Sequence, residues 1–482
     1  MMTNMKILYA ASEVVPFAAT GGLGDVMGSL PAAVQKLMAD GGDVRVVMPL
    51  YPKIRRDYGD SLTLLWEGEI SLAWRRLYMG ILSCVKDGIT HYFIDNEYYF
   101  RRESFYGDFD DGERFAFFSA AVLEMLDKID FYPNVIHAND WQTALLPVYL
   151  RLWYSGRSEY DSIRTVYTIH NISYQGIYSP EILWDVFGIW DSHRDILEYN
   201  GAVNLTKGGI VCADRVTTVT PTYAGEIQTE LYSHGLHHIL RDNSHKLSGI
   251  INGIDTERYS PENDKNLAQN YSAAFHGGKS ACKEELCRIC GFANDSRPIV
   301  GMVSRLVSPT GFDLVERVLR EMLDAGDAKF VLLGTGEKRY EDYFLYLSHI
   351  YEGSFRAYID FDSSLASKIY AGADMFLMPS QSEPCGLAQM IAARYGAVPI
   401  VRETGGLRDT IHSLRDDTGE GNGFTFANYN AHDMMYTIRR AISVYSSKRR
   451  WNKLMKQSMN TDFSWEKSAK EYLTLYEELM TN

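Results

Sequence analysis

The feature that most constrains this fold is an alternation of short apolar runs with amphipathic stretches, which extends over residues 6–251 and starts again over residues 299–401. The runs have the length of strands, and the stretches between them repeat their apolar residues at helical spacing. Strands that alternate with helices in this way form βαβ units and mostly parallel, doubly wound sheets. We therefore predict an α/β protein. The predicted strands cover residues 6–11, 44–48, 135–137, 165–169, 216–219, 249–251, 299–303, 330–334, 375–378 and 399–401.

A segment with a different pattern separates the two alternating stretches. After residues 252–255, Asn-Gly-Ile-Asp, the sequence is polar and helical as far as residue 298 and contains no predicted strand. We therefore predict two domains, of residues 1–255 and 256–462, followed by an amphipathic helix over residues 463–482. Ligands of open α/β sheets bind beyond the carboxyl ends of the strands, so we expect the two domains to face each other across a cleft.

Composition argues against several classes of function. The 482 residues hold 48 Lys and Arg against 62 Asp and Glu, a net charge of −14, which disfavours non-specific binding to nucleic acid or to anionic membranes. Six cysteines without a paired framework are typical of a reducing compartment. No secretory signal is evident at the start, and no window is apolar enough to span a bilayer. We expect a cytoplasmic protein.

A glycine-rich turn follows the first predicted strand. Gly21, Gly22 and Gly24 stand at the start of the first predicted helix, with Asp25 after them. Glycines let a ligand approach the backbone closely, and N–H groups at a helix start attract an anion such as a diphosphate. A tight turn also needs glycine for its own geometry, so the turn alone leaves both interpretations open.

Three comparable features follow strands in the second half. Glu383 lies between a strand and a helix, where a carboxylate can accept hydrogen bonds from sugar hydroxyls. Residues 404–406, Thr-Gly-Gly, offer further backbone N–H groups, and Arg305 can pair with a phosphate. Because each feature follows a strand, we expect them at one edge of the sheet.

Two polar clusters also follow strands in the first half, at residues 137–141 and at His170 and Asn171. A lone histidine is more often structural than catalytic. Two polar clusters at the same sheet edge as the glycine turn nevertheless favour a site.

Together these segments resemble the bacterial glycogen synthase and plant starch synthase family over essentially the whole chain. The matching segments are residues 21–25, 106–108, 111–115, 139–144, 168–171, 207–210, 252–255, 304–306, 334–336, 383–387 and 404–407. The resemblance implies a GT-B fold, two Rossmann-like domains with the last helix returning to the first. It also implies retaining transfer of glucose from ADP-glucose to the non-reducing 4-hydroxyl of an α-1,4-glucan, without a metal or another cofactor.

The resemblance further implies roles for single residues. Asp140, His170 and Asn252 would line the sugar side of the cleft. Glu383 would hold the glucose 3- and 4-hydroxyls, and Arg305 would meet the diphosphate. The implied catalytic residues are thus His170, Glu383, Arg305 and Asp140. The implied donor-binding residues are Gly21, Gly22, Gly24, Asp25, Asn252, Phe361, Cys385, Gly386, Leu387, Thr404, Gly405 and Gly406. Phe361 falls where the family has a tyrosine stacked on adenine, and stacking needs only an aromatic face.

Two positions depart from the family's pattern. The family has lysine before Thr-Gly-Gly-Leu, where this chain has Ala19, and lysine before glycine in its second motif, where this chain has Thr310. Both lysines serve the diphosphate in the family. Their loss predicts an attenuated transferase, unless Arg305, Arg402 or Arg408 supplies the missing charge.

Other readings remain. A degenerate synthase paralogue that binds glucan or nucleotide as a regulatory subunit would also account for the two departures. Glucan phosphorylase would need a pyridoxal-binding lysine context, which we do not find. Cys282, Cys287 and Cys290 include a CxxC, but no second pair with zinc-ligand spacing follows, and the segment predicts one helix in which the cysteines are structural. His234, His237 and His238 predict a surface cluster.

Overall fold

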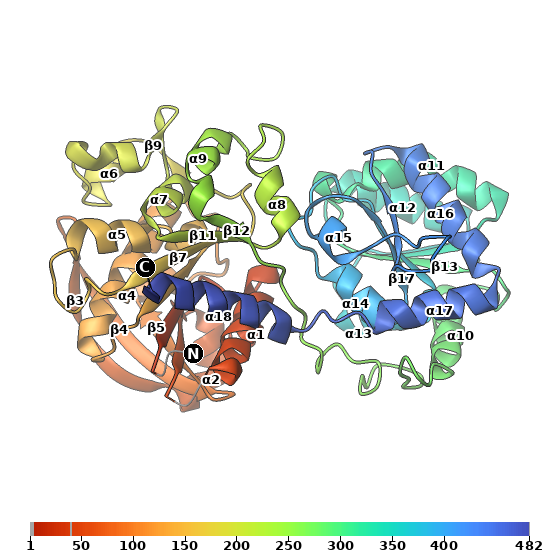
Figure 1. Cartoon of the computed structure of the whole chain (residues 1–482), viewed down its shortest axis with the longest axis horizontal. Helices are drawn as coiled ribbons and strands as arrows, with labels where there is room; N and C mark the ends of the chain where they lie inside the picture. The colour runs from red at the N-terminus through yellow and green to blue at the C-terminus, as the bar shows by residue number, and fades with distance from the viewer. Residues whose placement is uncertain (1–3, 39–40, 482) are drawn as a thin grey trace. The chain divides into compact units, whose positions relative to one another are not determined.

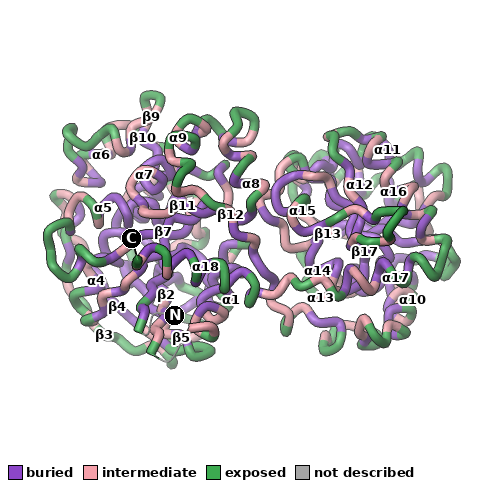
Figure 2. The backbone as a smooth tube through the Cα atoms, in the orientation of Figure 1, coloured by how far each residue is buried: buried purple, intermediate pink, exposed green. Residues whose placement is uncertain are grey.

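The structure is a computed structural model that describes residues 4–38 and 41–481. The chain divides into two compact units. The first comprises residues 4–253 and 465–481, and the second comprises Ile254–Ser464. Each unit is an α/β domain with its own sheet (Figure 1), and in each the central strands lie in the buried part of the fold (Figure 2).

The first unit is built on a nine-stranded sheet in the order β12-β11-β7-β6-β1-β2-β5-β4-β3. The seven strands from β12 to β5 pair in parallel, as the alternation predicted. The strands of this sheet are β1 (Lys6–Ala10), β2 (Asp43–Pro49), β3 (Thr63–Leu72), β4 (Arg75–Lys86), β5 (Ile89–Asp95), β6 (Val135–Asn139), β7 (Arg164–Ile169), β11 (Arg215–Thr218) and β12 (Leu247–Gly249).

Residues 63–95 form strands that the sequence analysis did not predict. β3 and β4 are antiparallel partners, and β4 is antiparallel to β5. β3 is exposed along most of its length because it is the edge of the sheet, so it lacks the continuous apolar run of a buried strand. β12 also ends at Gly249, two residues before the predicted end. A small second sheet contains β8 (Ile177–Tyr178), β10 (Ala202–Asn204) and β9 (Glu198–Tyr199).

The helices of the first unit connect its strands. They are α1 (Gly22–Leu37), α2 (Pro52–Tyr58), α3 (Glu97–Phe100), α4 (Asp111–Lys128), α5 (Leu145–Trp153), α6 (Ile182–Asp185), α7 (Leu205–Cys212), α8 (Pro221–Glu226), α9 (His237–Asp242) and α18 (Trp465–Thr481). The last of these packs against α1 (Figure 1). Tyr476 anchors it, because its hydroxyl lies 2.8 Å from the hydroxyl of Tyr9 and 2.6 Å from Nδ1 of His137. The predicted apolar face, Ala469, Tyr472, Leu473 and Tyr476, is buried.

The second unit has a six-stranded, wholly parallel sheet in the order β15-β14-β13-β16-β17-β18. Its strands are β13 (Ile299–Val303), β14 (Lys329–Leu333), β15 (Phe355–Tyr358), β16 (Met375–Met378), β17 (Val398–Arg402) and β18 (Phe424–Phe426). Its helices are α10 (Gly278–Cys290), α11 (Phe312–Ala325), α12 (Lys338–Ile350), α13 (Ser363–Gly372), α14 (Ala388–Arg394), α15 (Gly405–Thr410), α16 (Ala431–Tyr445) and α17 (Lys448–Met459). The predicted strands are confirmed here, whereas β15 and β18, of four and three residues, were not predicted.

The two chain crossings between the units run side by side. Ile254 pairs in parallel with Ser464, and its N–H donates to the carbonyl of Phe463 at 2.8 Å. The hydroxyl of Ser468 donates to the carbonyl of Ile251. None of the helices formed by the described residues has both the length and the apolar character needed to cross a membrane.

Candidate active site

In the first unit, predicted site residues gather at the carboxyl ends of three neighbouring strands. The glycine turn follows β1, Asp140 follows β6 directly, and His170 follows β7 directly. These strands are adjacent in the order β7-β6-β1. The sheet therefore places a helix start, a carboxyl group and an imidazole at one edge.

Asp140 is held in an unusual conformation. Its φ is +58°, which is rare for a residue with a side chain. The backbone on both sides fixes it: its N–H donates to the carbonyl of Thr168 at 2.9 Å, and its Oδ1 accepts from the N–H of His170 at 2.7 Å. Burial raises the pKa of Asp140 to about 7, against the lowering effect of the N–H groups of His170 and Asn171. A strained, desolvated carboxyl group at a strand end is typical of a functional site.

His170 is a neutral ring in contact with the end of β6. Its Nε2 lies 2.9 Å from Oδ1 of Asn139, a fully buried side chain. Burial lowers the pKa of His170 to about 3. The ring can therefore form a hydrogen bond with a ligand while it remains uncharged.

The glycine turn is organised by a carboxylate that the sequence analysis did not identify. Glu13 accepts hydrogen bonds from the N–H groups of Thr20 and Gly21, from the hydroxyl of Thr20, and from that of Tyr106 at 2.6 Å. The N–H of Gly24 donates to the carbonyl of Gly21 at 3.1 Å. Two of the N–H groups that we expected to face a diphosphate are thus used within the protein.

Open space lies beside both Gly21 and Gly22, but the N–H of Gly21 is already bound by Glu13, so the position that we expect to meet a ligand is Gly22. It is the exposed first residue of α1, and a Cβ added to it would meet no atom within 4 Å. At Gly24, by contrast, an added Cβ would lie 2.3 Å from the Cβ of Ala19. Gly24 is therefore required by packing, whereas Gly22 leaves free space beside a helix start. Asp25 lies in the first turn of the same helix.

Asn252 follows β12 at the same edge of the sheet and is buried. Its Oδ1 is a buried acceptor without a hydrogen-bond partner among the residues that the structure describes. Buried polar atoms are nearly always paired, so this oxygen is a candidate for a ligand contact.

In the second unit, Arg305, Glu383 and Thr404 follow β13, β16 and β17, which are neighbours in the sheet. Arg305 is exposed. Burial raises the pKa of Glu383 to about 7, while Ser380 and the charge of Arg305 act in the opposite direction. The contact with Ser380 joins its hydroxyl to Oε2 of Glu383 at 3.3 Å. The sheet thus sets a cation and a desolvated carboxyl group at one edge.

The two loops beside Glu383 are in close backbone contact. The N–H of Gly406 lies 3.1 Å from the carbonyls of both Glu383 and Pro384, and the N–H of Thr404 donates to the carbonyl of Arg402 at 3.0 Å. A Cβ at Gly405 would lie 2.0 Å from the carbonyl of Glu383, so glycine is required there. The turn at residues 404–406 therefore supports the Glu383 loop, and at Thr404 and Gly406 the expectation of available N–H groups is not met.

The residues after Glu383 form the entry to α14. Cys385 is buried, Gly386 has a φ of +71°, and Leu387 precedes the helix. Gln389 holds this entry by donating from Nε2 to the carbonyls of Cys385 and Gly386, each at 3.0 Å.

Neither of the two residues that depart from the family pattern offers a charged side chain to a ligand. Ala19 is half-buried and offers no donor beyond its backbone. The hydroxyl of Thr310 lies 3.1 Å from the carbonyl of Arg305 and 2.5 Å from that of Val307, so it is engaged within its own turn. Arg402 also makes an internal contact, from Nη1 to the carbonyl of Gln381 at 2.7 Å. Arg408 is exposed on α15.

Phe361 lies between β15 and α13 and is 92% exposed. A large aromatic side chain with this exposure offers a free face for stacking.

The cysteines and the histidine cluster singled out in the sequence have other contacts. Cys282, Cys287 and Cys290 are buried in α10 with free thiols, and burial raises the pKa of each. His234 contacts the hydroxyl of Ser173 at 3.1 Å, and His237 that of Ser233 at 3.2 Å. Within residues 4–38 and 41–481, no group of three or more metal-ligating side chains is assembled.

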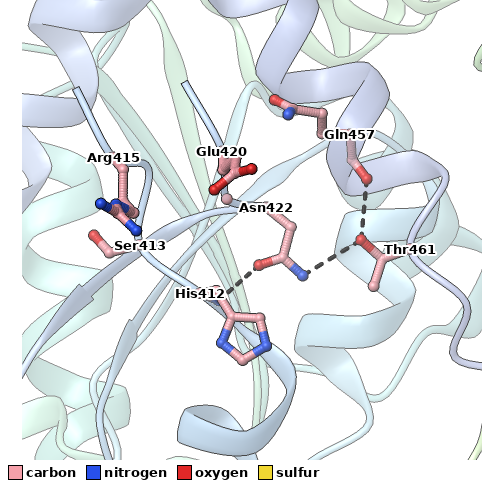
Figure 3. A pocket seen from close by; sticks show the side chains of 8 residues that line it. His412, Ser413, Arg415, Glu420, Asn422, Gln457 and Thr461 are labelled. Carbon is pink, nitrogen blue, oxygen red and sulfur yellow. Dashed lines mark hydrogen bonds between the residues drawn. The ribbon is translucent and has the colours of Figure 1, made fainter. Parts of the chain in front are cut away.

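A cavity of about 400 Å³ opens in the second unit, and Figure 3 shows the side chains that line it. Its lining comprises His412, Ser413, Arg415, Glu420, Gly421, Asn422, Gln457 and Thr461. Asn422 spans it, accepting from the N–H of His412 and donating to the hydroxyl of Thr461. The cavity lies beside the start of β18, so it is at the opposite end of the strands from Arg305 and Glu383.

Two organising residues could not be assigned roles from the sequence. Glu13 follows the first strand, and Asn139 lies within the predicted cluster at residues 137–141. In the sequence, the position of each residue at or after the end of a strand was the available signal. The contacts of Glu13 with Gly21 and of Asn139 with His170 are visible only in the folded structure.

Comparison with protein families matches the starch synthase catalytic domain over residues 6–242 and the glycosyl transferases group 1 over residues 291–458. Glycogen synthase of Bacillus cereus is 48% identical over 479 residues, 99% of this chain and 100% of that protein. Glycogen synthase of Clostridium novyi is 47% identical over 480 residues, 99% of each chain.

Among solved structures, the catalytic domain of starch synthase IV from Arabidopsis thaliana, bound to ADP and acarbose, aligns with a TM-score of 0.89 at 34% identity and 100% coverage of both chains. Sucrose-phosphate synthase from Thermosynechococcus elongatus shares the fold, with a TM-score of 0.61 at 16% identity over 99% of this chain and 100% of that one. The predicted α/β fold of the GT-B type is confirmed by these matches. The full-length identity to glycogen synthases and the match to starch synthase IV establish that this chain belongs to the glycogen synthase and starch synthase family of glycosyltransferases.

Proposed function

We propose that this protein is a retaining glucosyltransferase that elongates an α-1,4-glucan from ADP-glucose. Full-length identity of 48% to a glycogen synthase supports the reaction, and the relative bound to ADP and acarbose supports the two ligand classes. The first unit would supply the glucan side with Asp140, His170 and Asn252. The second unit would supply the nucleotide-sugar side with Glu383, Arg305 and Phe361.

The observation that carries this proposal is the environment of Glu383. Its carboxyl group is desolvated, and Ser380 is its hydrogen-bond partner through Oε2 among the described residues. Oε1 is therefore available to accept from a hydroxyl. A carboxylate that offers acceptors next to an arginine fits a sugar joined to a diphosphate, because the sugar carries donors and the diphosphate is an anion.

The proposed mechanism uses these groups to stabilise charge and to orient the sugar. As the bond between glucose and ADP breaks, negative charge develops on the diphosphate, which Arg305 and the start of α1 at Gly22 would stabilise. Glu383 would orient the glucosyl group through its hydroxyls, and the neutral ring of His170 would contact the same sugar. The glucan 4-hydroxyl would take the glucosyl group with retention of the anomeric configuration, and its proton would pass to the departing diphosphate.

Two cationic groups that the family brings to the diphosphate are replaced by Ala19 and Thr310, and Thr310 uses its hydroxyl within its own turn. We therefore propose that turnover is attenuated. A hydrogen bond to a charged group contributes about 1.5–3 kcal/mol, so two losses in the transition state correspond to a rate lower by about 10²- to 10⁴-fold. The same observation favours a second candidate, a glucan- or nucleotide-binding subunit with little turnover.

A glucan-elongation assay with radiolabelled ADP-glucose and UDP-glucose tests both candidates. Transfer from ADP-glucose to a maltooligosaccharide that is lost in Glu383→Gln would support the transferase. Saturable glucan binding without transfer from either donor would support the binding subunit and contradict the transferase.

A further inference from the structure

Asn139 is a buried amide whose orientation is fixed by the ends of two neighbouring strands. Its Nδ2 donates to the carbonyls of Ala10, at 3.2 Å, and of His137, at 3.1 Å. Ala10 ends β1 and Asn139 ends β6, which pair in parallel. A flipped amide would place its oxygen against two carbonyl oxygens, so Oδ1 is the atom that faces His170.

This orientation determines which nitrogen of His170 carries the proton. Nε2 lies 2.9 Å from Oδ1 of Asn139, and an amide oxygen can only accept a hydrogen bond. Burial keeps the ring neutral by lowering its pKa to about 3, so the ring has a single N–H. That N–H must be at Nε2, and Nδ1 carries the lone pair. Among the described residues, Nδ1 has no hydrogen-bond partner in the protein.

The position of His170 does not depend on Asn139 alone. The N–H of His170 donates to Oδ1 of Asp140 at 2.7 Å, and His170 directly follows β7. The main chain is thus held by the sheet and by Asp140. Asn139 acts on the ring, and its specific contribution is the choice of tautomer.

We propose that Asn139 is a positioning residue that holds His170 in its Nε2–H tautomer, so that Nδ1 meets the substrate as a hydrogen-bond acceptor. A hydroxyl group can donate to Nδ1 in this form, whereas in the other tautomer the same atom would itself be a donor. The assignment of a sugar hydroxyl as the ligand rests on the proposed function. The assignment of the tautomer is independent of it, because contacts within the first unit determine the tautomer.

The tautomer can be observed directly by long-range ¹H–¹⁵N correlation spectroscopy on deuterated protein with ¹⁵N-labelled histidine. The resonances of His170 are assigned by their loss in His170→Gln. We expect the wild type to show a protonated Nε2 and an unprotonated Nδ1. In Asn139→Leu, which removes the acceptor, the two nitrogens should move toward averaged values or the opposite tautomer. Asn139→Asp, protonated so that its hydroxyl donates to the carbonyls of Ala10 and His137, keeps an acceptor oxygen toward Nε2 and should keep the wild-type pattern.

Thr217→Val is the matched control. It removes a buried hydroxyl from the same sheet, 2.5 Å from the hydroxyl of Thr168, without touching His170 or Asn139. The control should leave the tautomer and the kinetics unchanged. Asn139→Leu should lower kcat by about tenfold or more with a KM for maltooligosaccharide within about twofold, and Asn139→Asp should recover most of the loss.

Two results would overturn the proposal. One is a wild-type spectrum with the proton at Nδ1, which needs no variant to fold. The other is an Asn139→Leu spectrum identical to the wild type. If the wild type transfers no glucose, the proposed function fails, but the spectra still decide the role of Asn139.

Discussion

The carboxylate of Glu13 accepts a hydrogen bond from the backbone N–H of Gly21 at 3.1 Å, and in this way a side chain after β1 closes the turn that starts α1. An N–H group at a helix start is a position where an anionic ligand would bind. Here a protein carboxylate already occupies it. The turn therefore receives its shape from Glu13 and presents Gly22, one residue further along, to a ligand.

Replacing Glu13 by Gln should loosen this turn. The carboxylate accepts from the N–H groups of Thr20 and Gly21 through Oε2 and from the hydroxyls of Thr20 and Tyr106 through Oε1. An amide keeps one oxygen for the N–H groups, but it loses the charge and forces the two hydroxyls to accept instead of donate. We expect a loss of about 1–3 kcal/mol in the free energy of unfolding, measured by urea denaturation. Tyr106→Phe removes one of these contacts and should cost less. Equal unfolding free energies of Glu13→Gln and the wild type would show that the charge of Glu13 does not contribute to stability.

The space beside Gly22 predicts a separation of binding from stability. Gly22→Val adds a side chain where no atom lies within 4 Å, so its melting temperature should stay within about 2 °C of the wild type. ADP affinity, measured by calorimetry, should fall at least tenfold, because the branched side chain would lie where we propose that the diphosphate binds. Gly225→Val, which is also free of contacts within 4 Å, is the control and should bind ADP normally. Unchanged ADP binding in Gly22→Val would move the diphosphate site elsewhere.

Two raised pKa values predict an acid limb in the pH dependence of transfer. The pKa of Asp140 and that of Glu383 are each raised to about 7 by burial. If the carboxylate forms are active, kcat/KM should rise with pH through about 7. Glu383→Gln should lower activity at least tenfold and remove one of the two ionisations from the profile, measured with ADP-glucose and maltooligosaccharide. An acid limb of the same steepness in the variant would exclude Glu383 as its source.

The same two groups affect stability with the opposite sign. Because their folded-state pKa values lie above the ordinary values, the folded protein binds protons more tightly between about pH 4 and pH 7. Their contribution to stability is fully present below this window and is lost as the pH rises through it. The difference in unfolding free energy between Asp140→Asn and the wild type should therefore shift in favour of the variant from about pH 4 to pH 7.

Lys279 provides a pH test in the second unit. Its Nζ donates to the carbonyls of Ala371, Ala373 and Tyr395 at 2.9–3.0 Å, and burial lowers its pKa to about 8. Between about pH 8 and pH 10.5 the unfolded chain binds the proton that the folded chain has lost, so this group makes stability rise with pH.

Lys279→Met should remove that rise and should take away the donor to the carbonyls of Ala371 and Ala373, at a cost of about 1–3 kcal/mol near neutral pH, while the carbonyl of Tyr395 keeps its hydrogen bond from the hydroxyl of Tyr271. Denaturant melts of the two proteins at matched pH values measure the difference. A parallel pH dependence in the two proteins would contradict the assignment.

The missing cations predict a gain of function. Ala19→Lys and Thr310→Lys should each raise kcat by about tenfold or more, since each would place a cation where the family places one for the diphosphate. The pair should be less than additive because both would meet one diphosphate. Ala19→Met and Thr310→Met match the length of lysine without its charge and should not raise kcat. Robust wild-type turnover that the lysines leave unchanged would end the attenuation proposal.

The sequence by itself determined the fold class and most parallel strands, because a buried parallel strand is a short apolar run that can be recognised locally. β13 and β16 are examples, at residues 299–303 and 375–378. It also placed Asp140, His170, Arg305 and Glu383 at strand ends, since polar residues directly after such runs must lie at the carboxyl edge of the sheet.

The tertiary structure decided which groups meet there. The edge strand β3 has a largely exposed apolar start at residues 64–66 and polar residues among its later positions, so its pairing with β4 becomes visible only once the sheet is formed. Likewise, the N–H of Gly406 donates to the carbonyl of Glu383, and Oδ1 of Asn139, at the end of β6, accepts from His170, which follows the neighbouring strand β7. Hydrogen-bond partners 23 to 31 positions apart leave no local pattern in the sequence, because their contact arises from the order and register of the strands rather than from the residues between them.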